Sequence, residues 1–450
     1  MKKIIVVLLT LLMITAVLTA CSKAQDQPTE SNDASADTSA KTTETIAVSA
    51  TQTTSNSSTK LSQPEEVTTT ANVTSNGAID ASKIFSDRDL KQTADLSDAV
   101  YYDLSDNNNI TITKEGVYVI SGSAADATVI VDAGDNDKVQ LVFNGATVKN
   151  SSAPAVYVKN ADKVFVTTVE GTTTELSVTG TFTADGDTNT DAVIFSKDDL
   201  VLNGLGTLTI NSSDNGISGK DDIKITGGTI NITSTSDAIE ANESIAVADG
   251  NLTIKSSKDA LHAENDEDNA TGYVYICGGT FNITATSDGI QATTIAQIDG
   301  GNITASAAEA IEATYVQING GTIKITASDD GINATSKSTA QSVKIEINGG
   351  DITVNMAQGD TDGLDSNGDL YINGGTIDIT AQSPFDYDGQ GQLNGGTVTV
   401  NGSQVTELTN QMMGGGMGGG RGGMGGDPNM NGNGGMNNGN GGPMGGGFAR

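Results

Sequence analysis

The chain has 450 residues, a formal net charge of −33 and 4% aromatic residues, with no tryptophan. This balance excludes nucleic acid as a partner, and also a membrane surface held by charge, because no excess of basic residues is available to neutralise phosphates or anionic lipids. A secreted protein that binds cations or sugars fits the composition.

The first 21 residues predict export and a lipid anchor. Lys2 and Lys3 precede an apolar stretch, Ile4 to Val17, which is too short for a membrane span and typical of a signal peptide. The following Leu18-Thr19-Ala20-Cys21 looks like a bacterial lipobox. We therefore expect a signal peptide over 1–20, lipid on Cys21, and a protein anchored to the cell membrane and exposed at the cell surface. The alternative is an ordinary signal peptide followed by a chance cysteine. With Cys21 lipidated, Cys277 is the remaining thiol, and no intrachain disulfide is expected.

Two segments lack the residues needed for a core. Residues 21–76 are rich in Ser, Thr, Asp and Gln, which predicts a disordered linker, or stalk, behind the lipid. Residues 409–450 form a Gly/Met/Asn-rich tail that is also expected to be disordered. Between them, residues 77–408 are predicted to form one domain.

The domain reads as short strands with alternating apolar residues, such as Val139–Phe143 and Val164–Val166. From about Leu200 a repeat dominates, roughly 20 to 29 residues long, in the range of solenoid proteins. Each unit reads apolar-x-apolar-Asn-Gly-Gly-Thr-Ile-x-Ile-Thr and then Asp-Gly-Ile-x-Ala. Three apolar pairs per unit predict three strands per coil, and hence an all-β, right-handed parallel β-helix with coils about 4.8 Å apart. One coil has the pairs Ile230 and Ile232, Ile239 and Ala241, Ile245 and Val247.

Stacking of like residues follows from this fold. The position before Gly-Gly is predicted to form an asparagine ladder, from Asn203, Asn319, Asn348, Asn373 and Asn394. Aligned through Asp-Gly-Ile, a first column holds acids only: Asp237, Asp259, Asp288, Glu309, Asp330 and Asp362. Three residues later a second column holds Glu240, His262, Gln291, Glu312, Asn333 and Asp365.

The stacked acids predict bound calcium. Neighbouring carboxylates about 4.8 Å apart repel by about 3 kcal/mol at an effective dielectric constant near 20. Ca²⁺ removes this repulsion because it accepts many oxygen ligands in a flexible geometry. The alternative is that Asp-Gly is only a turn dipeptide with solvated charges. The predicted metal ligands are Asp237, Glu240, Asp259, Asp288, Glu309, Glu312, Asp330, Asp362 and Asp365, above all where both columns hold an acid.

Two insertions, residues 264–272 and 335–342, follow the same strand of their coils and should emerge at one corner. Catalysis has little support, because His262 is the only histidine and is expected at the surface. We predict no catalytic residue.

The segment 383–389 places Phe385 and Tyr387 beside two acids and is expected to interrupt the repeat near the last coil. Inward-facing rings would close the end of the solenoid. Outward-facing rings would stack on a sugar, which makes Phe385 and Tyr387 candidate polysaccharide-binding residues.

The runs 191–204 and 215–222, together with the Asp-Gly-Ile repeats, resemble the clostridial carbohydrate-binding lipoproteins with a pectate-lyase-like β-helix. The resemblance covers about residues 80 to 400. It implies a calcium-containing β-helix that binds cellulose-like or acidic plant polysaccharides. The chain departs from that pattern at Ala238, Ala260 and Ala310, which replace glycine after the acid. Alanine tolerates a left-handed turn poorly, so these corners are expected to differ in shape.

We therefore expect calcium-dependent, non-catalytic polysaccharide binding at the cell surface by a monomer. Two alternatives remain open. One is a calcium-dependent pectate-type lyase on the same scaffold, and the other is a surface adhesin or structural spacer.

Overall fold

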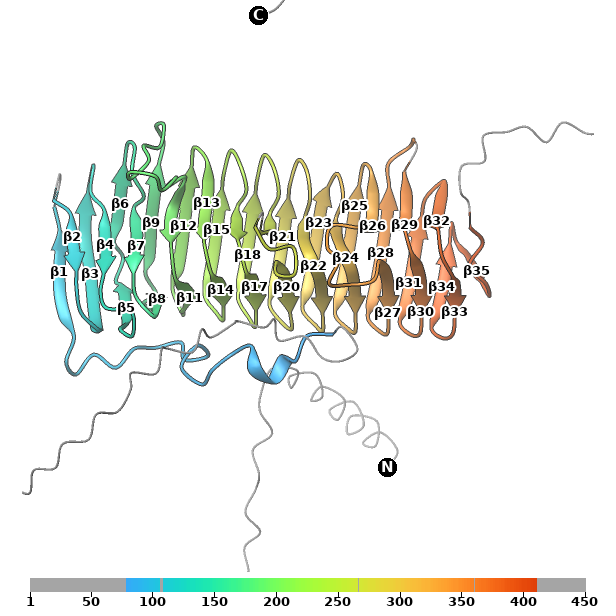
Figure 1. Ribbon diagram of the computed structural model, residues 1–450, viewed down its shortest axis with the longest axis horizontal. Helices are drawn as coiled ribbons and strands as arrows, with labels where there is room; N and C mark the ends of the chain where they lie inside the picture. Colours follow the sequence, from blue (N-terminus) through green and yellow to red (C-terminus); the bar gives the residue numbers. More distant parts are fainter. Residues whose placement is uncertain (1–77, 106–107, 266, 360, 411–450) are drawn as a thin grey trace, which may run out of the picture. The chain divides into compact units, whose positions relative to one another are not determined.

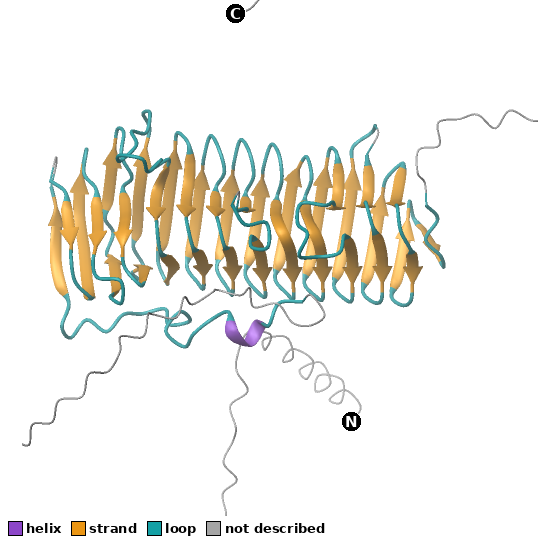
Figure 2. Ribbon diagram, viewed as in Figure 1, coloured by secondary structure: helices purple, strands orange, loops and turns teal. Residues whose placement is uncertain are grey.

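Alternating apolar residues build a stack of β-coils in the computed structural model, which describes residues 78–105, 108–265, 267–359 and 361–410 (Figure 1). The predicted signal peptide, the linker and residues 411–450 lie outside the described residues. Among the described residues helix is limited to the short 3₁₀ turn η1 (Ala81–Lys83), as Figure 2 shows. No helix in this part of the chain is long and apolar enough to cross a membrane.

Each coil contributes strands to three stacked faces, in which every pairing but one is parallel. Face 1 consists of β1 (Val100–Leu104), β3 (Gly116–Ala124), β5 (Lys138–Phe143), β8 (Lys163–Thr168), β11 (Asp199–Gly204), β14 (Asp222–Ile225), β17 (Ser244–Val247), β20 (Tyr273–Ile276), β27 (Lys344–Ile347), β30 (Asp369–Ile372) and β33 (Gly391–Leu393). Face 2 consists of β2 (Ile110–Ile112), β4 (Val129–Asp132), β7 (Val156–Asn160), β10 (Ala192–Ser196), β13 (Asn215–Gly219), β16 (Ile239–Ala241), β19 (Leu261–Ala263), β26 (Asp330–Ala334), β29 (Asp362–Ser366) and β32 (Ser383–Tyr387). The strands β22 (Ile290–Ile298) and β24 (Ile311–Ile318) run through both faces.

Face 3 closes each coil. It consists of β6 (Thr147–Asn150), β9 (Thr173–Val178), β12 (Thr207–Ser212), β15 (Thr229–Thr233), β18 (Asn251–Lys255), β21 (Thr280–Thr284), β23 (Asn302–Ala307), β25 (Thr322–Ala327), β28 (Asp351–Met356), β31 (Thr376–Thr380), β34 (Thr397–Val400) and β35 (Ser403–Val405). The final pair, β34 and β35, is antiparallel and ends the stack. The predicted parallel β-helix is confirmed.

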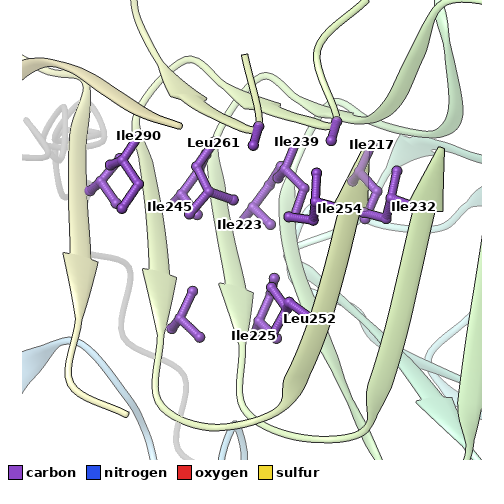
Figure 3. Close-up of a cluster of buried hydrophobic side chains, with 14 of the residues drawn as sticks. Ile217, Ile223, Ile225, Ile232, Ile239, Ile245, Leu252, Ile254, Leu261 and Ile290 are labelled. Atoms are coloured by element: carbon purple, nitrogen blue, oxygen red, sulfur yellow. The ribbon is translucent and has the colours of Figure 1, made fainter. Parts of the chain in front are cut away.

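The core is a set of aligned apolar columns inside the coils. Ile217 pairs with Ile239, and Ile239 with Leu261, so each column places an aliphatic side chain on its like. Figure 3 shows these columns, and all of their members are buried. Burying one such side chain contributes about 1.5–3 kcal/mol, which explains why inward positions hold Ile, Val and Leu almost throughout.

The Gly-Gly corner is required by the close approach of successive coils. A Cβ on Gly349 would lie 2.5 Å from the carbonyl oxygen of Asn319 in the preceding coil. The next residue, Gly350, has φ of 97°, a left-handed conformation that favours glycine. The asparagine before this corner forms the predicted ladder over four coils. Nδ2 donates to the Oδ1 of the preceding asparagine at 2.8 Å for each of Asn348, Asn373 and Asn394.

Residues 78–99, here called the flank segment, do not belong to the coils. The first solenoid strand begins at Val100, and the flank segment runs along the outside of face 1 (Figure 1, blue). Ile79 N–H donates to Gln297 Oε1 at 2.7 Å, and Asn203 Nδ2 donates to the Lys91 carbonyl at 3.0 Å. Ile84 is buried against the aromatic and small apolar residues of face 1. The segment therefore crosses several coils in the direction opposite to their order.

The segment 383–389 does not interrupt the repeat, contrary to our expectation. β32 continues face 2 in register with β29, and Phe385 lies over Leu364. The Phe385 side chain is 2% exposed and belongs to the core, which excludes it from stacking on a sugar. Tyr387 is half-buried against the same core, and its hydroxyl donates to the Leu408 carbonyl at 3.1 Å. The inward interpretation therefore holds for Phe385.

Truncation of Phe385 should loosen the last coils. We expect Phe385→Ala to lower the free energy of unfolding by about 3–5 kcal/mol, as for other buried aromatic residues. Tyr387→Phe removes one hydrogen bond and should lower it by about 1 kcal/mol. Amide hydrogen exchange in β29 and β32, followed with chemical denaturation, measures both. Native-like protection in Phe385→Ala would show that the ring does not hold the end of the stack.

Candidate cation site on the acidic ladder

The first acidic column lies at the start of the face 2 strands, where each carboxylate reaches the next coil. Asp237 Oδ1 accepts the backbone N–H of Asp259 at 2.9 Å, and Asp259 Oδ1 accepts that of Asp288 at 2.7 Å. Further along, Asp330 Oδ1 accepts the N–H of Asp362 at 3.1 Å. The parallel stacking thus makes three of the six acids hydrogen-bond acceptors for the backbone of the next coil.

The second column lies in the middle of the same strands and is in register as predicted. Its pairs run from Glu240 over His262, Gln291, Glu312 and Asn333 to Asp365. The structure extends it by Asp386 in the next coil. We call the two columns together the acidic ladder. Glu240 is turned toward the preceding coil, where its Oε2 accepts from Asn215 Nδ2 at 2.9 Å and from Ser218 Oγ at 3.2 Å.

The ladder is not a row of solvated charges. Asp237, Asp259 and Asp288 are 4–8% exposed, and Glu309, Asp330 and Asp365 are half-buried. The interpretation of Asp-Gly as a merely solvated turn is therefore wrong for the buried members. Buried carboxylates that stack on one another need compensation from hydrogen bonds or positive charge.

The N-terminal half of the ladder has its own cation in His262, which is not the exposed residue we expected. Its Nδ1 lies 3.5 Å from Asp237 Oδ2 and 3.7 Å from Asp259 Oδ2, and its Nε2 lies 2.8 Å from Glu264 Oε2. Burial alone would lower the pKa of His262, but the bonds to Asp237 and Glu264 raise it to about 9. The imidazolium form therefore occupies this position at neutral pH.

The middle of the ladder is closed by a lysine from an insertion. Lys337 Nζ lies 2.8 Å from Glu312 Oε2. In the amide orientation that satisfies its neighbours, Gln291 donates to Asp259 and Asp288 and accepts from Lys337. The two insertions meet here, as the sequence predicts, since Ser338 Oγ donates to the Asn269 carbonyl.

The C-terminal half of the ladder has no cation of this kind among the described residues. Glu309, Asp330 and Asp365 make no ion pair with any basic side chain that the structure describes. Burial raises the pKa of Glu309 to about 7, and nearby Glu312 and Asp330 add to the shift. Burial also raises the pKa of Asp330 and of Asp365 to about 7, with further contributions from neighbouring carboxylates.

One buried oxygen in this half has no hydrogen-bond partner. Asn333 is 8% exposed, and its Nδ2 donates to Glu309 Oε2 at 2.9 Å. Its Oδ1 is buried without a hydrogen bond. Carboxylates beside an unsatisfied amide oxygen form an oxygen-only donor set, which suits Ca²⁺. Among the described residues, two groups have possible ligand atoms within 4.8 Å of one another: Asp288, Glu309 and Glu312, and Asp237, Asp259 and His262.

Alanine after the acid does not change the corner, contrary to our expectation. Gly216, Gly289 and Gly331 are not left-handed. Ala238 and Ala310 donate their N–H to the next coil in the same way as Gly289 does. The acids before alanine and before glycine therefore stack alike.

The expectation of a lone Cys277 thiol is also wrong. Cys277 is disulfide-bonded, and the described part of the chain has no free cysteine. Its side chain lies on face 1 in the cluster that contains Tyr275 and Ile84, away from the acidic ladder.

Several site residues escaped the sequence analysis. Lys337 lies in an insertion, which has no register with the repeat. Asn333 was placed in the second column but not among the predicted metal ligands, which are all acids. Asp386 is one of the two acids that the sequence places beside Phe385 and Tyr387, and the register adds it to the second column.

Comparisons with known proteins show the family of the chain. The sequence profile of the carbohydrate-binding domain-containing protein family matches residues 106–357 and 308–407, and the chain belongs to this family. A carbohydrate-binding domain-containing protein of Acetivibrio thermocellus is 34% identical over 122 residues, which are 26% of this chain and 43% of that relative. The chain thus spans less than half of that relative's length. A solved structure, the polysaccharide lyase-like protein from C. thermocellum in a gadolinium derivative, is 25% identical, with a TM-score of 0.43 over 60% of this chain and 98% of that one.

The ladder predicts an unusual pH dependence of stability. Because the pKa values of Glu309, Asp330 and Asp365 are raised to about 7, the folded protein keeps protons that the unfolded chain releases above about pH 4. Stability should therefore fall as the pH rises from about 4 to about 7. The ion pairs of His262 act in the same direction, since their contribution is lost as the pH rises through about 9.

We expect the melting temperature in chelator to be higher at pH 5 than at pH 8. Asp365→Asn, which cannot ionise, should reduce the difference. Thermal unfolding followed by circular dichroism across this range measures both. A melting temperature that rises steadily from pH 5 to pH 8 contradicts the expected coupling.

Proposed function

We propose that this member of the carbohydrate-binding family binds polysaccharide without cleaving it, and that calcium on the acidic ladder bridges acidic sugars to the protein. The observation that supports this most is the C-terminal half of the ladder. There, half-buried carboxylates lie beside the orphaned Asn333 Oδ1 without a described basic partner.

The residues proposed to hold the ion are Glu309, Asp330, Asn333, Asp362 and Asp365. Bound calcium would neutralise the stacked carboxylates and offer remaining coordination positions to the carboxylate of a sugar acid. The protein's own part is to align the oxygens, which the parallel register does through the pairs Asp330 with Asp362 and Asn333 with Asp365. Glu309 is held toward Asn333 by the amide hydrogen bond.

A lyase is the less favoured function. A base is needed to remove a proton from the sugar, and Lys337 is the lysine whose ion pair reaches the described ladder. Burial alone would lower the pKa of Lys337, but the contact with Glu312 raises it above its ordinary value. A lysine held protonated by a carboxylate is poorly suited to accept a proton. His262 is likewise held in its protonated form.

Binding to polygalacturonate should require calcium and the C-terminal half of the ladder. We expect Asp365→Asn to weaken calcium-dependent binding by roughly tenfold or more, because it removes a charged ligand. It should also reduce the rise in melting temperature that calcium produces. Asp378→Asn, which changes an exposed acid of face 3 in the same region, is the matched control and should behave like the native protein.

Affinity electrophoresis on polygalacturonate, with calcium and with chelator, measures the binding, and absorbance of unsaturated products tests for cleavage. Equal binding in calcium and in chelator would contradict the proposal that calcium bridges the sugar to the protein. Release of unsaturated products would establish the lyase alternative. If the protein bound no glycan at all, the structural spacer would be the remaining alternative.

We also propose that the mature chain is anchored through lipid on Cys21 and acts at the cell surface. Cys21→Ser should move the protein from the membrane to the soluble fraction. Fractionation and intact mass measure this, and a processed Cys21→Ser protein that stays in the membrane rules out the anchor.

A further inference from the structure

A cavity of about 570 Å³ lies between the flank segment and face 1, away from the acidic ladder. Arg88, Lys91, Thr93 and Asp95 of the flank segment line one side, and Val117 and Gln140 of β3 and β5 line the other. Its volume is in the range of about 300–1,000 Å³ that is typical of small-molecule sites.

The cavity is lined by two cations that form no close ion pair with a described residue. The Arg88 guanidinium lies 4.5 Å from the centre of the Phe165 ring and makes no ion pair with any residue that the structure describes. Lys91 likewise has no carboxylate within ion-pair distance among these residues. The chain carries 56 acidic and 23 basic residues, so two neighbouring cations without partners are unexpected here.

The opposite wall presents a hydrogen-bond acceptor. Gln140 is 8% exposed, and its Nε2 donates to Thr167 Oγ1 at 3.1 Å. No described residue donates to its Oε1. The amide of Gln140 is thereby fixed in orientation by Thr167, with one acceptor unused at the cavity.

The wall formed by the flank segment is held in place by face 1. Gln92 Nε2 donates to the Thr226 carbonyl at 2.8 Å, and Gln92 Oε1 accepts the N–H of Gly204 at 3.0 Å. Asn203 holds the Lys91 carbonyl in the same way. Because these bonds already fix the backbone that follows Arg88, a ligand would lose little affinity to ordering this part of the segment.

We infer that this cavity is a second subsite, independent of calcium, for a sugar that carries a carboxylate. The guanidinium of Arg88 and the ammonium of Lys91 bind the carboxylate, as charge-assisted hydrogen bonds favour. Gln140 Oε1 accepts from a ring hydroxyl, and Val117 offers an apolar surface to the ring. The inference rests on the proposed carbohydrate binding and adds a place where a sugar acid is bound directly by protein cations.

The net negative charge of the chain does not prevent this. Charges are screened over about 8 Å at physiological ionic strength, so the nearest groups decide the local field. Asp95, the one acid that lines the cavity, is exposed and accepts the N–H of Ser97 at 3.0 Å. A neutral sugar would leave Arg88 and Lys91 uncompensated, and the site should therefore discriminate against it.

The test is calorimetric titration of trigalacturonate into the full chain in the presence of chelator. We expect measurable binding, weakened roughly tenfold or more in Arg88→Gln, because the variant loses a charge-assisted bond. The matched control is Lys83→Gln, which changes an exposed cation of the same flank segment and should bind like the native chain. Thr93→Asp, at an exposed position lining the cavity, places a carboxylate opposite the ligand and should abolish binding even if Arg88→Gln fails to fold.

Cellotriose and inorganic phosphate are the comparison ligands. Binding of trigalacturonate alone supports a sugar-acid site, whereas equal competition by phosphate overturns it in favour of a general anion site. Absence of binding in chelator also overturns it. If calcium-dependent binding to polygalacturonate persists in that case, the proposed function stands and only this subsite fails.

Discussion

Parallel, in-register stacking of the coils is the constraint on which the rest of this structure depends. With coils about 4.8 Å apart, each residue meets its counterpart in the coils before and after it. For isoleucine, as in the column from Ile217 to Leu261, this repetition is favourable because it buries apolar surface without gaps. For asparagine it yields a chain of amide hydrogen bonds. For acids the same geometry forces like charges together.

The groups that compensate this repulsion differ along the ladder. Backbone N–H groups of the next coil bind the first-column carboxylates, which is possible only because the coils run parallel. His262 and Lys337 supply positive charge to the N-terminal half and the middle. The described residues offer no such cation to Glu309, Asp330 or Asp365, and burial keeps the pKa of these three acids near 7. Acids without a described cation are thus concentrated in one half of face 2, where we propose that an external cation binds.

The two proposed sites bind the carboxylate of a sugar acid in different ways: through a metal ion on face 2 and through basic side chains on face 1. In the proposed function, the oxygen ligands of face 2 hold a metal ion, and a sugar acid binds there through that ion. Face 1 is covered by the flank segment, which brings Arg88 over Phe165 and leaves its guanidinium without a described acidic partner. The same side of the molecule is otherwise closed by the contacts of Ile79, Ile84 and Gln92. A single solenoid can therefore carry two separate surfaces for one class of polymer.

The sequence by itself determined the coil, the inward columns, the asparagine ladder and the identity of both acidic columns, because a repeat that pairs with itself leaves little freedom in register. It could not determine which acids are compensated. Lys337 reaches Glu312 from an insertion, and Phe385 turns inward because β32 keeps the register of β29. The course of the flank segment was equally out of reach, since residues 78–99 carry no repeat and their neighbours lie more than a hundred positions away, as Asn203 and Lys91 do. Long-range contacts of single side chains are decided by the tertiary structure, whereas a periodic core can be predicted from the sequence repeat that forms it.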